Sequence, residues 1–192
     1  MTRPLLLILL VGVFMGLTAG NTEAANPKVL LKTSRGDITI ELFADKAPVT
    51  VKNFLDYVDA KFYDGLIFHR VIKGFMIQGG GLTADLATRT PRAQIKNEAG
   101  NGLKNTRGTV AMARSGEINS ATCQFFINHV DNDFLDHRDQ TAAGFGYCVF
   151  GKVLSGLDVV DAIATTPTMT VHGMKDVPRE AVTIVSIRRL ES

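Results

Sequence analysis

The stretch that decides the fold is FHRVIKGFMIQGG, which spans Phe68–Gly80. Apolar, β-prone residues lie on both sides of a central lysine–glycine pair, and glycine readily adopts the backbone angles of a tight turn. The pattern predicts two short strands joined by a turn, over residues 66–71 and 75–78. Because side chains alternate along a strand, Gln78 shares a face with the methionine two residues before it. That mixed face is a candidate for a binding site.

Strand and turn signals continue on the N-terminal side of this stretch. Ile38, Ile40 and Leu42 occupy every second position, which predicts a hairpin over residues 28–42 with one buried face. After Pro48, apolar residues recur at the spacing of a helix, and proline is tolerated in a first helical turn. The sequence therefore predicts a hairpin followed by an amphipathic helix.

The C-terminal side follows the same scheme. Further strands are expected over residues 94–97, 109–113, 123–128, 147–153 and 181–190. A capping box at Ser155–Asp158 precedes a second helix. About eight strands and two helices in one domain predict a mainly β fold. The expected architecture is a closed eight-stranded antiparallel β-barrel capped by two α-helices.

The N-terminus has the three regions of a secretory signal: a short positive start, the apolar run Leu5–Leu17, and small polar residues. The apolar run is too short to cross a membrane as a helix, which takes about 20 residues. We expect residues 1–25 to be a cleaved signal peptide, cut after Ala24 or Ala25. Residues 26–192 then form the mature domain, without stable membrane association. An uncleaved signal anchor is the alternative.

Composition excludes some classes of function. The chain of 192 residues carries 21 Lys+Arg and 19 Asp+Glu, a net charge of +2, whereas a dedicated nucleic-acid binder has a clustered basic face. Cys123 and Cys148 lack metal-ligand spacing, and so do His129, His137 and His172. The two cysteines are either a disulfide or, as we favour, two buried thiols. We expect no metal and no organic cofactor.

The opening stretch closely resembles the signature of the cyclophilins, a family of peptidyl-prolyl cis–trans isomerases. The resemblance runs from Lys28 to Leu190, and residues 96–114 look like the periplasmic cyclophilins of bacteria. It implies an isomerase that acts, as a monomer in the periplasm, on proline-containing segments of exported proteins. Three further blocks match in order: 111–114, 123–127, and 134–136 together with 147–153.

The chemistry of this reaction explains why the motif needs an arginine. Rotation about a peptide bond has a barrier of about 18–20 kcal/mol, which comes from resonance, and no bond is broken. A catalyst therefore needs neither a nucleophile nor a metal, but it must bind the twisted amide selectively. The resemblance implies that Arg70 is the catalytic residue, which donates to the prolyl nitrogen. The alternative role for Arg70 is that of a strand residue in a surface ion pair.

The candidate substrate-binding groove surrounds this arginine. Gln78 and Gln124 lie two residues from Met76 and Phe126, and a core strand does not usually carry inward glutamines at two places. The resemblance adds a proline-binding wall and a strand that binds extended peptide backbone. The candidate residues are Phe75, Met76, Gln78, Ala113, Arg114, Gln124, Phe126, Phe134, Leu135 and Tyr147.

Three positions depart from the pattern of the eukaryotic cytosolic cyclophilins. Phe134 stands in place of tryptophan, Tyr147 in place of histidine, and Arg114 in place of asparagine. Phe134 lacks the indole N–H of tryptophan, so we expect weaker binding of cyclosporin-type ligands. Its ring still provides an apolar wall for isomerisation. His69 lies inside the motif, but the reaction needs no proton transfer, so we interpret it as a support for the strand.

Two other functions fit a β-rich domain with a groove. One is a module that binds proline-containing segments without turnover, which would have no need of Arg70. The other is a barrel that holds a small ligand or a lipid. Large residues expected to point inward, such as Ile38, Phe125 and Phe150, would fill that interior.

Overall fold

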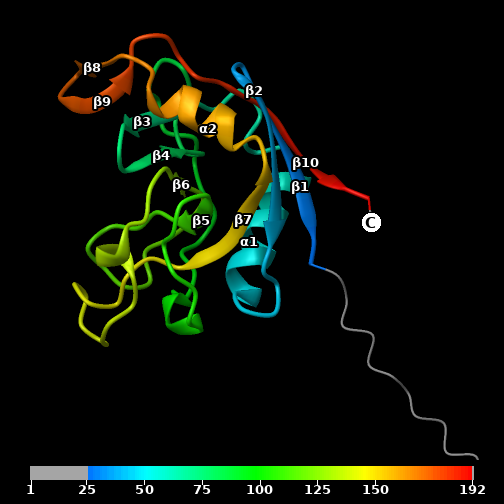
Figure 1. Cartoon of the computed structure of the whole chain (residues 1–192), viewed down its shortest axis with the longest axis vertical. Helices are drawn as coiled ribbons and strands as arrows, with labels where there is room; N and C mark the ends of the chain where they lie inside the picture. The colour runs from blue at the N-terminus through cyan, green and yellow to red at the C-terminus, as the bar shows by residue number, and fades with distance from the viewer. Residues whose placement is uncertain (1–25, 192) are drawn as a thin grey trace, which may run out of the picture.

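An eight-stranded antiparallel sheet forms the body of the protein (Figure 1). The computed structural model describes residues 26–191, so the expected signal peptide over residues 1–25 lies outside the described residues. The strand order is β10-β1-β2-β7-β5-β6-β4-β3. The strands are β1 (Lys28–Thr33), β2 (Gly36–Leu42), β3 (Phe68–Ile72), β4 (Met76–Gly79), β5 (Thr109–Met112), β6 (Phe125–Asn128), β7 (Val149–Ser155) and β10 (Ile184–Leu190).

The sheet is an open half-barrel, so the expectation of a closed barrel is wrong. Its two outer strands, β3 and β10, do not form a ladder within residues 26–191. An isolated bridge joins Ile67 to Thr183, one residue before each of these strands begins. Neighbouring backbone hydrogen bonds support it, such as the one that Ile184 N–H donates to Leu66 O at 2.7 Å. Beyond this contact, β9 (Met174–Pro178) packs beside β3 instead.

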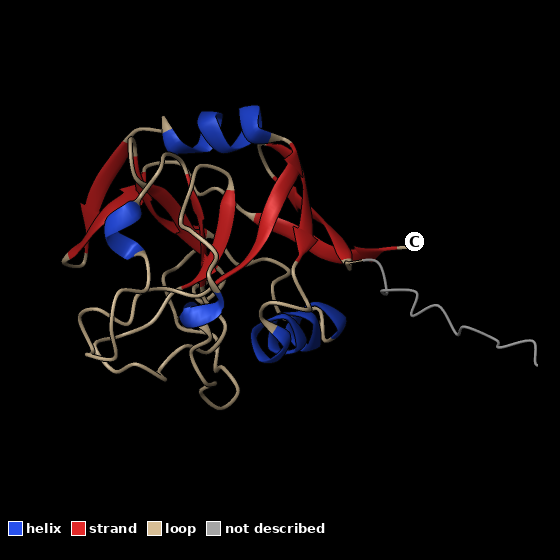
Figure 2. Cartoon of the chain, turned by 60° about the horizontal axis from the view of Figure 1, so that its bottom comes forward, coloured by secondary structure: helices blue, strands red, loops and turns tan. Residues whose placement is uncertain are grey.

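Two α-helices lie at opposite ends of the half-barrel, as Figure 2 shows, and buried side chains of both enter the main core. The helix α1 (Pro48–Asp59) begins at the predicted proline, and α2 (Leu157–Ala164) follows β7. The capping box predicted before α2 does not form, because Gly156 occupies the N-cap with φ 89° and no side chain caps the helix. Two 3₁₀ turns, η1 (Ala99–Asn101) and η2 (Asp133–Leu135), lie in the long loops.

One pair of strands was not predicted from the sequence. β8 (Thr168–Val171) and β9 form a separate two-stranded sheet after α2. Most of β8 is exposed or half-buried, so it lacks the alternation of apolar and polar residues that marks a half-buried strand. The short strand expected over residues 94–97 is reduced to a single bridge between Ile95 and Ala121.

The interior of the half-barrel is filled by large apolar side chains. Ile38, Ile40, Phe125 and Phe150 are all fully buried, as predicted. Phe54 of α1 packs among them, with its ring centroid 5.6 Å from that of Phe125 in an edge-to-face arrangement. These side chains fill the space that a small ligand or a lipid would need inside the sheet.

The two cysteines are free thiols, and both are buried. Burial raises the pKa of Cys148 to about 11 and also raises the pKa of Cys123. The reading of these residues as buried thiols agrees with this arrangement. Among residues 26–191, no helix is long and apolar enough to cross a membrane.

Candidate active site

A second apolar cluster lies on the outer face of β4, β5 and β6, apart from the main core. Side chains alternate along these strands, so Ile77 and Phe125 enter the core while Met76 and Phe126 enter the second cluster. Half-buried residues such as Tyr147 pack against it. This cluster forms the floor of a surface pocket.

The pocket is open to solvent and has about 400 Å³ of space not filled by atoms, with the solvent at its mouth included. It brings together the candidate catalytic residue and eight of the ten candidate binding residues, which lie far apart in the sequence. The lining residues are Arg70, Phe75, Met76, Gln78, Ala113, Arg114, Phe126, Leu135 and Tyr147.

Strand register explains why these side chains meet. Arg70 of β3 pairs with Gln78 of β4, and Gln78 pairs in turn with Phe126 of β6. Residues directly opposite each other in antiparallel strands project to the same face. The arginine, the glutamine and the phenylalanine therefore form one row across three neighbouring strands.

Arg70 is exposed at the rim of this pocket. Its guanidinium carbon lies 6.0 Å from the centroid of the Phe75 ring. No hydrogen bond or ion pair joins Arg70 to another side chain among the described residues. Its donors are therefore available to a bound molecule.

A β-bulge precedes Arg70 in its strand. The pairing of β3 with β4 shifts between Phe68 and Arg70, which leaves His69 without an opposite partner. Bulges occur often beside active sites, where they change the direction of a side chain. Strict alternation of side chains therefore does not hold at His69 and Arg70.

The two glutamines bond to each other. Nε2 of Gln78 donates to Oε1 of Gln124 at 2.9 Å. Gln124 lies outside the apolar pocket and lines a polar pocket next to it. The pair forms the boundary between the two pockets.

Sequence reasoning missed the other residues of this polar pocket. They are Ser115, Ser120 and Thr122. Thr122 stands two residues before Gln124, so the same alternation could have placed it on this face. The two serines lie on a loop, where no periodicity indicates direction.

Arg114 closes one end of the pocket and joins two loops. Its Nε donates to Gly146 O at 2.9 Å, and its Nη2 donates to Ala142 O at 2.9 Å. Its guanidinium also lies over the Tyr147 ring, 4.9 Å from the centroid. Because most of its donors are engaged by carbonyl groups, Arg114 shapes the pocket more than it can bind a peptide.

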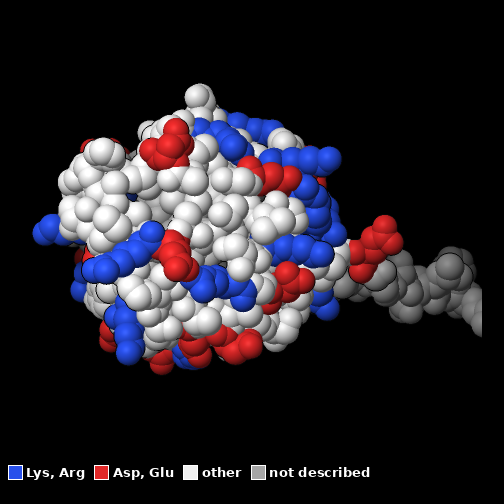
Figure 3. Space-filling view, turned by 90° about the horizontal axis from the view of Figure 1, so that it is seen from above, with Lys and Arg blue, Asp and Glu red and all other residues white. Residues whose placement is uncertain are grey.

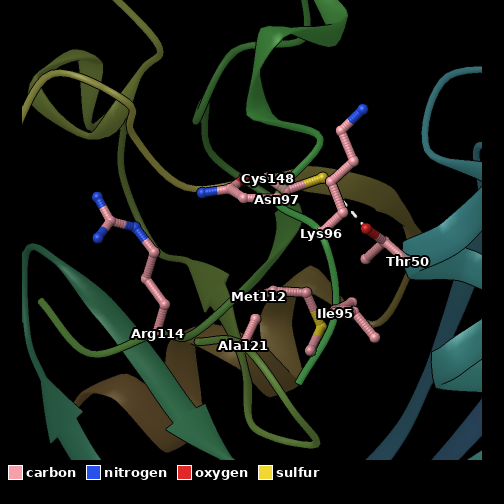
Figure 4. Close-up of a pocket in the computed structure, with 8 residues that line it drawn as sticks. All are labelled: Thr50, Ile95, Lys96, Asn97, Met112, Arg114, Ala121 and Cys148. Atoms are coloured by element: carbon pink, nitrogen blue, oxygen red, sulfur yellow. Dashed lines mark hydrogen bonds between the residues drawn. The ribbon is translucent and has the colours of Figure 1, made fainter. Parts of the chain in front are cut away.

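Behind this wall lies a small cavity that contains the Cys148 thiol (Figure 4). The Sγ atom of Cys148 lies 3.5 Å from Oγ1 of Thr50. The Arg114 side chain points away from both residues. The raised pKa keeps this thiol protonated at neutral pH, so it is a poor nucleophile.

Phe134 lies at the rim and does not line the pocket. Its ring stacks on that of Phe75, with centroids 5.6 Å apart and an interplanar angle of 27°. The residue is 58% exposed, whereas the neighbouring Leu135 is buried against Met76 and Phe126. Of the candidate binding residues, Phe134 and Gln124 are therefore the two outside the apolar pocket.

The pocket offers non-covalent contacts to a bound molecule. Within the described part of the chain, no group of three or more His, Cys, Asp or Glu could hold a metal ion. An exposed cation beside an apolar pocket can bind a lone pair or a carbonyl oxygen while the pocket excludes water.

Known structures share this fold. A cyclophilin type peptidyl-prolyl cis-trans isomerase of Cryptosporidium parvum, solved in the presence of the dipeptide Ala-Pro, matches with a TM-score of 0.70 and 28% sequence identity. The match covers 86% of this chain and 99% of that one. The protein therefore has the cyclophilin fold.

Sequence comparisons agree with the structural match. The family described as cyclophilin type peptidyl-prolyl cis-trans isomerase/CLD matches residues 28–189. Peptidyl-prolyl cis-trans isomerase B of Escherichia coli is 55% identical over 159 residues, which cover 83% of this chain and 97% of that protein. A peptidyl-prolyl cis-trans isomerase of Acinetobacter baylyi is 51% identical and covers 90% of both chains. The chain belongs to the cyclophilin family and is a peptidyl-prolyl cis–trans isomerase.

Proposed function

We propose that Arg70 catalyses the isomerisation by donating to the prolyl nitrogen of a substrate held in the apolar pocket. The observation that carries the proposal is the free guanidinium at the rim of a pocket floored by Met76 and Phe126. A proline ring is apolar and compact, so it suits such a floor. The structure with Ala-Pro concerns a relative with the same fold and supports this choice of ligand.

The proposed mechanism stabilises the twisted amide. When the C–N bond rotates out of the plane, resonance is lost and the prolyl nitrogen regains its lone pair. A donor at that nitrogen binds the twisted form more strongly than the planar form, which is the requirement for catalysis. The apolar floor removes water that would otherwise stabilise the planar, charge-separated amide.

The magnitude of this effect shows that the arginine does not act alone. A hydrogen bond to a charged group contributes about 1.5–3 kcal/mol, which corresponds to a rate factor of roughly 10 to 200. The remaining acceleration then comes from the pocket and from backbone pairing along Ala113, next to β5. Such backbone pairing gives affinity with little sequence preference.

We further propose that the protein acts as a monomer on unfolded or partly folded exported proteins in the periplasm. The signal-like pattern over residues 1–25 and the bacterial relatives support this location. Figure 3 shows positive and negative side chains mixed on the visible face, which does not favour a nucleic acid as partner.

Peptide titration followed by NMR tests the location of the site. A short Ala-Pro peptide is expected to shift the backbone amide signals of Phe75, Gln78 and Phe126. The groove beside α1, lined by residues such as Val51 and Leu55, serves as the internal control. Shifts confined to that groove would refute the proposed site.

The same samples separate an enzyme from a module that only binds. Exchange peaks between the cis and trans forms of the peptide are expected at catalytic amounts of protein. Binding at the pocket without such exchange would instead support the binding module, the first of the two alternative functions considered above.

A further inference from the structure

His129 lies outside the pocket but contacts the turn that carries one of its walls. It follows β6 directly, and only 14% of its side chain is exposed. Its backbone N–H donates to Phe75 O at 2.9 Å, and the Gly74 N–H donates to its Nδ1 at 3.1 Å. Both bonds end on the turn between β3 and β4.

These contacts determine which ring nitrogen of His129 carries the proton. Nδ1 accepts from Gly74, so the proton of the neutral ring is on Nε2. Nε2 lies 3.2 Å from Oδ1 of Asp161 in α2, where it can donate to the carboxylate. A neutral imidazole thus satisfies both partners and bridges α2 to the turn.

The far end of this bridge is firmly anchored. Arg107 pairs with Asp161 through two parallel bonds of 2.8 Å each, and the same guanidinium donates to His129 O at 2.7 Å. Bidentate pairs of this kind have a defined geometry as well as extra strength. The guanidinium also holds the pKa of the Asp161 carboxyl below its usual range, so the carboxylate remains an acceptor.

The near end of the bridge reaches the pocket. Phe75 lines the pocket and lies beside Arg70, and its backbone oxygen accepts a second bond, from Nδ2 of Asn132 at 2.9 Å. The position of the Phe75 ring therefore depends on how the turn before it is held. Gly74 lies in that turn with φ 75°, a conformation that glycine adopts without strain.

We propose that His129 is a positioning residue of the isomerase, which holds Phe75 against the bound proline through the bond that its Nδ1 accepts from the Gly74 N–H. The proposal rests on the proposed function, because it takes Phe75 as a wall of the substrate site. The affinity for substrate then depends on His129. The hydrogen bond that Arg70 donates to the prolyl nitrogen does not depend on His129.

Two amide variants separate the two bonds of the ring. His129→Asn keeps an acceptor near the position of Nδ1 but cannot reach Asp161, and His129→Gln reaches Asp161 but leaves Gly74 unbound. We expect His129→Gln to raise KM for an X-Pro peptide by about three- to tenfold, the worth of one modest hydrogen bond. For both variants kcat should stay near the parent value, and His129→Asn should also have a KM close to that of the parent.

The Gly74 amide signal provides a readout independent of activity. It should move in His129→Gln and stay near its parent position in His129→Asn. His172→Asn, which removes an exposed imidazole from the β8–β9 turn, is the control and should change neither KM nor the Gly74 signal.

Equal KM values for the folded Asn and Gln variants would overturn the proposal. Failure of the proposed function has a different signature, namely unchanged activity in Arg70→Ala. An inactive Arg70→Ala protein together with equal KM values in the two His129 variants would refute only the role of His129.

Discussion

His69 shows how burial sets the charge of a single side chain next to the site. It directly precedes Arg70, and burial lowers its pKa from 6.5 to about 4. Its Nδ1 is buried without a hydrogen-bond partner. The ring is therefore neutral at pH 7, which suits a reaction that transfers no proton.

The same shift predicts how stability depends on pH. Between pH 6.5 and about 4, His69 takes up a proton in the unfolded chain but not in the folded protein. The contribution of neutral His69 to the free energy of unfolding is thus complete above pH 6.5. It is lost as the pH falls towards 4, and the loss is about 3 kcal/mol at most. Urea unfolding at pH 7 and pH 4.5 should show a smaller loss in His69→Gln than in the parent. Equal losses would contradict the assignment.

Phe134 is the residue that separates turnover from ligand binding. Because it is exposed and stacks on Phe75, tryptophan can replace it without filling the pocket. We expect Phe134→Trp to leave peptide turnover nearly unchanged. It should tighten binding of cyclosporin-type ligands by about tenfold, through one added N–H donor and a larger ring.

Fluorescence titration of the parent and the variant with one such ligand measures this difference. Phe134→Leu, which has no donor, is the matched control and should show no gain. Equal affinities of the parent and Phe134→Trp would show that Phe134 is not what limits binding.

At the scale of elements, α1 begins with a cap supplied from a distant loop. Its N-cap residue, Ala47, has no capping side chain. The carboxylate of Glu98 instead accepts from the backbone N–H groups of Val49 at 3.2 Å and of Thr50 at 2.8 Å. A carboxylate at this end also interacts favourably with the helix dipole. The loop before β5 is thereby tied to α1.

Removal of this cap should destabilise the fold. We expect Glu98→Ala to lower the free energy of unfolding by about 1–2 kcal/mol, and Glu98→Gln by less, because the amide oxygen can still accept. Denaturant unfolding measures both. Glu180→Ala removes a carboxylate that is 81% exposed and should cost little. A Glu98→Ala protein as stable as Glu180→Ala would argue against the cap.

Local patterns predicted most of the elements but not how distant ones meet. The hairpin of β1 and β2, the start of α1 and the strands around Arg70 follow from alternation and turn residues. The two edges of the half-barrel meet through the isolated bridge between Ile67 and Thr183, and α1 is capped by Glu98. Both are contacts between segments that lie far apart in the sequence. No periodicity in the sequence encodes such contacts.

The candidate site divides in the same way. Arg70 and the apolar floor line one pocket because they lie on neighbouring strands, and strand alternation is visible in the sequence. The engagement of Arg114 by loop carbonyls and the bridge through His129 depend on loop conformation, so no sequence pattern indicates either.

At the scale of the whole molecule, the two faces of the sheet have separate tasks. One face holds the core that α1 covers, and the other carries the pocket. A substitution in the pocket can therefore change activity while the core keeps the fold. This separation is what makes variants of the site informative.

Export is a prediction about the whole chain. We expect the protein isolated from its native host to begin at Ala25 or Asn26, since the signal-like segment ends there. N-terminal sequencing measures this directly. A protein that retains Thr2 would support an uncleaved anchor instead.

The most direct test of the account is the isomerisation rate of Arg70→Ala on an X-Pro peptide. Loss of one charge-assisted bond should lower kcat/KM by about 10- to 200-fold. Arg35→Ala, which removes an exposed arginine paired with Glu180, is the matched control and should retain the parent rate. A folded Arg70→Ala protein with kcat/KM within about threefold of the parent, below the range expected for such a bond, would contradict the account.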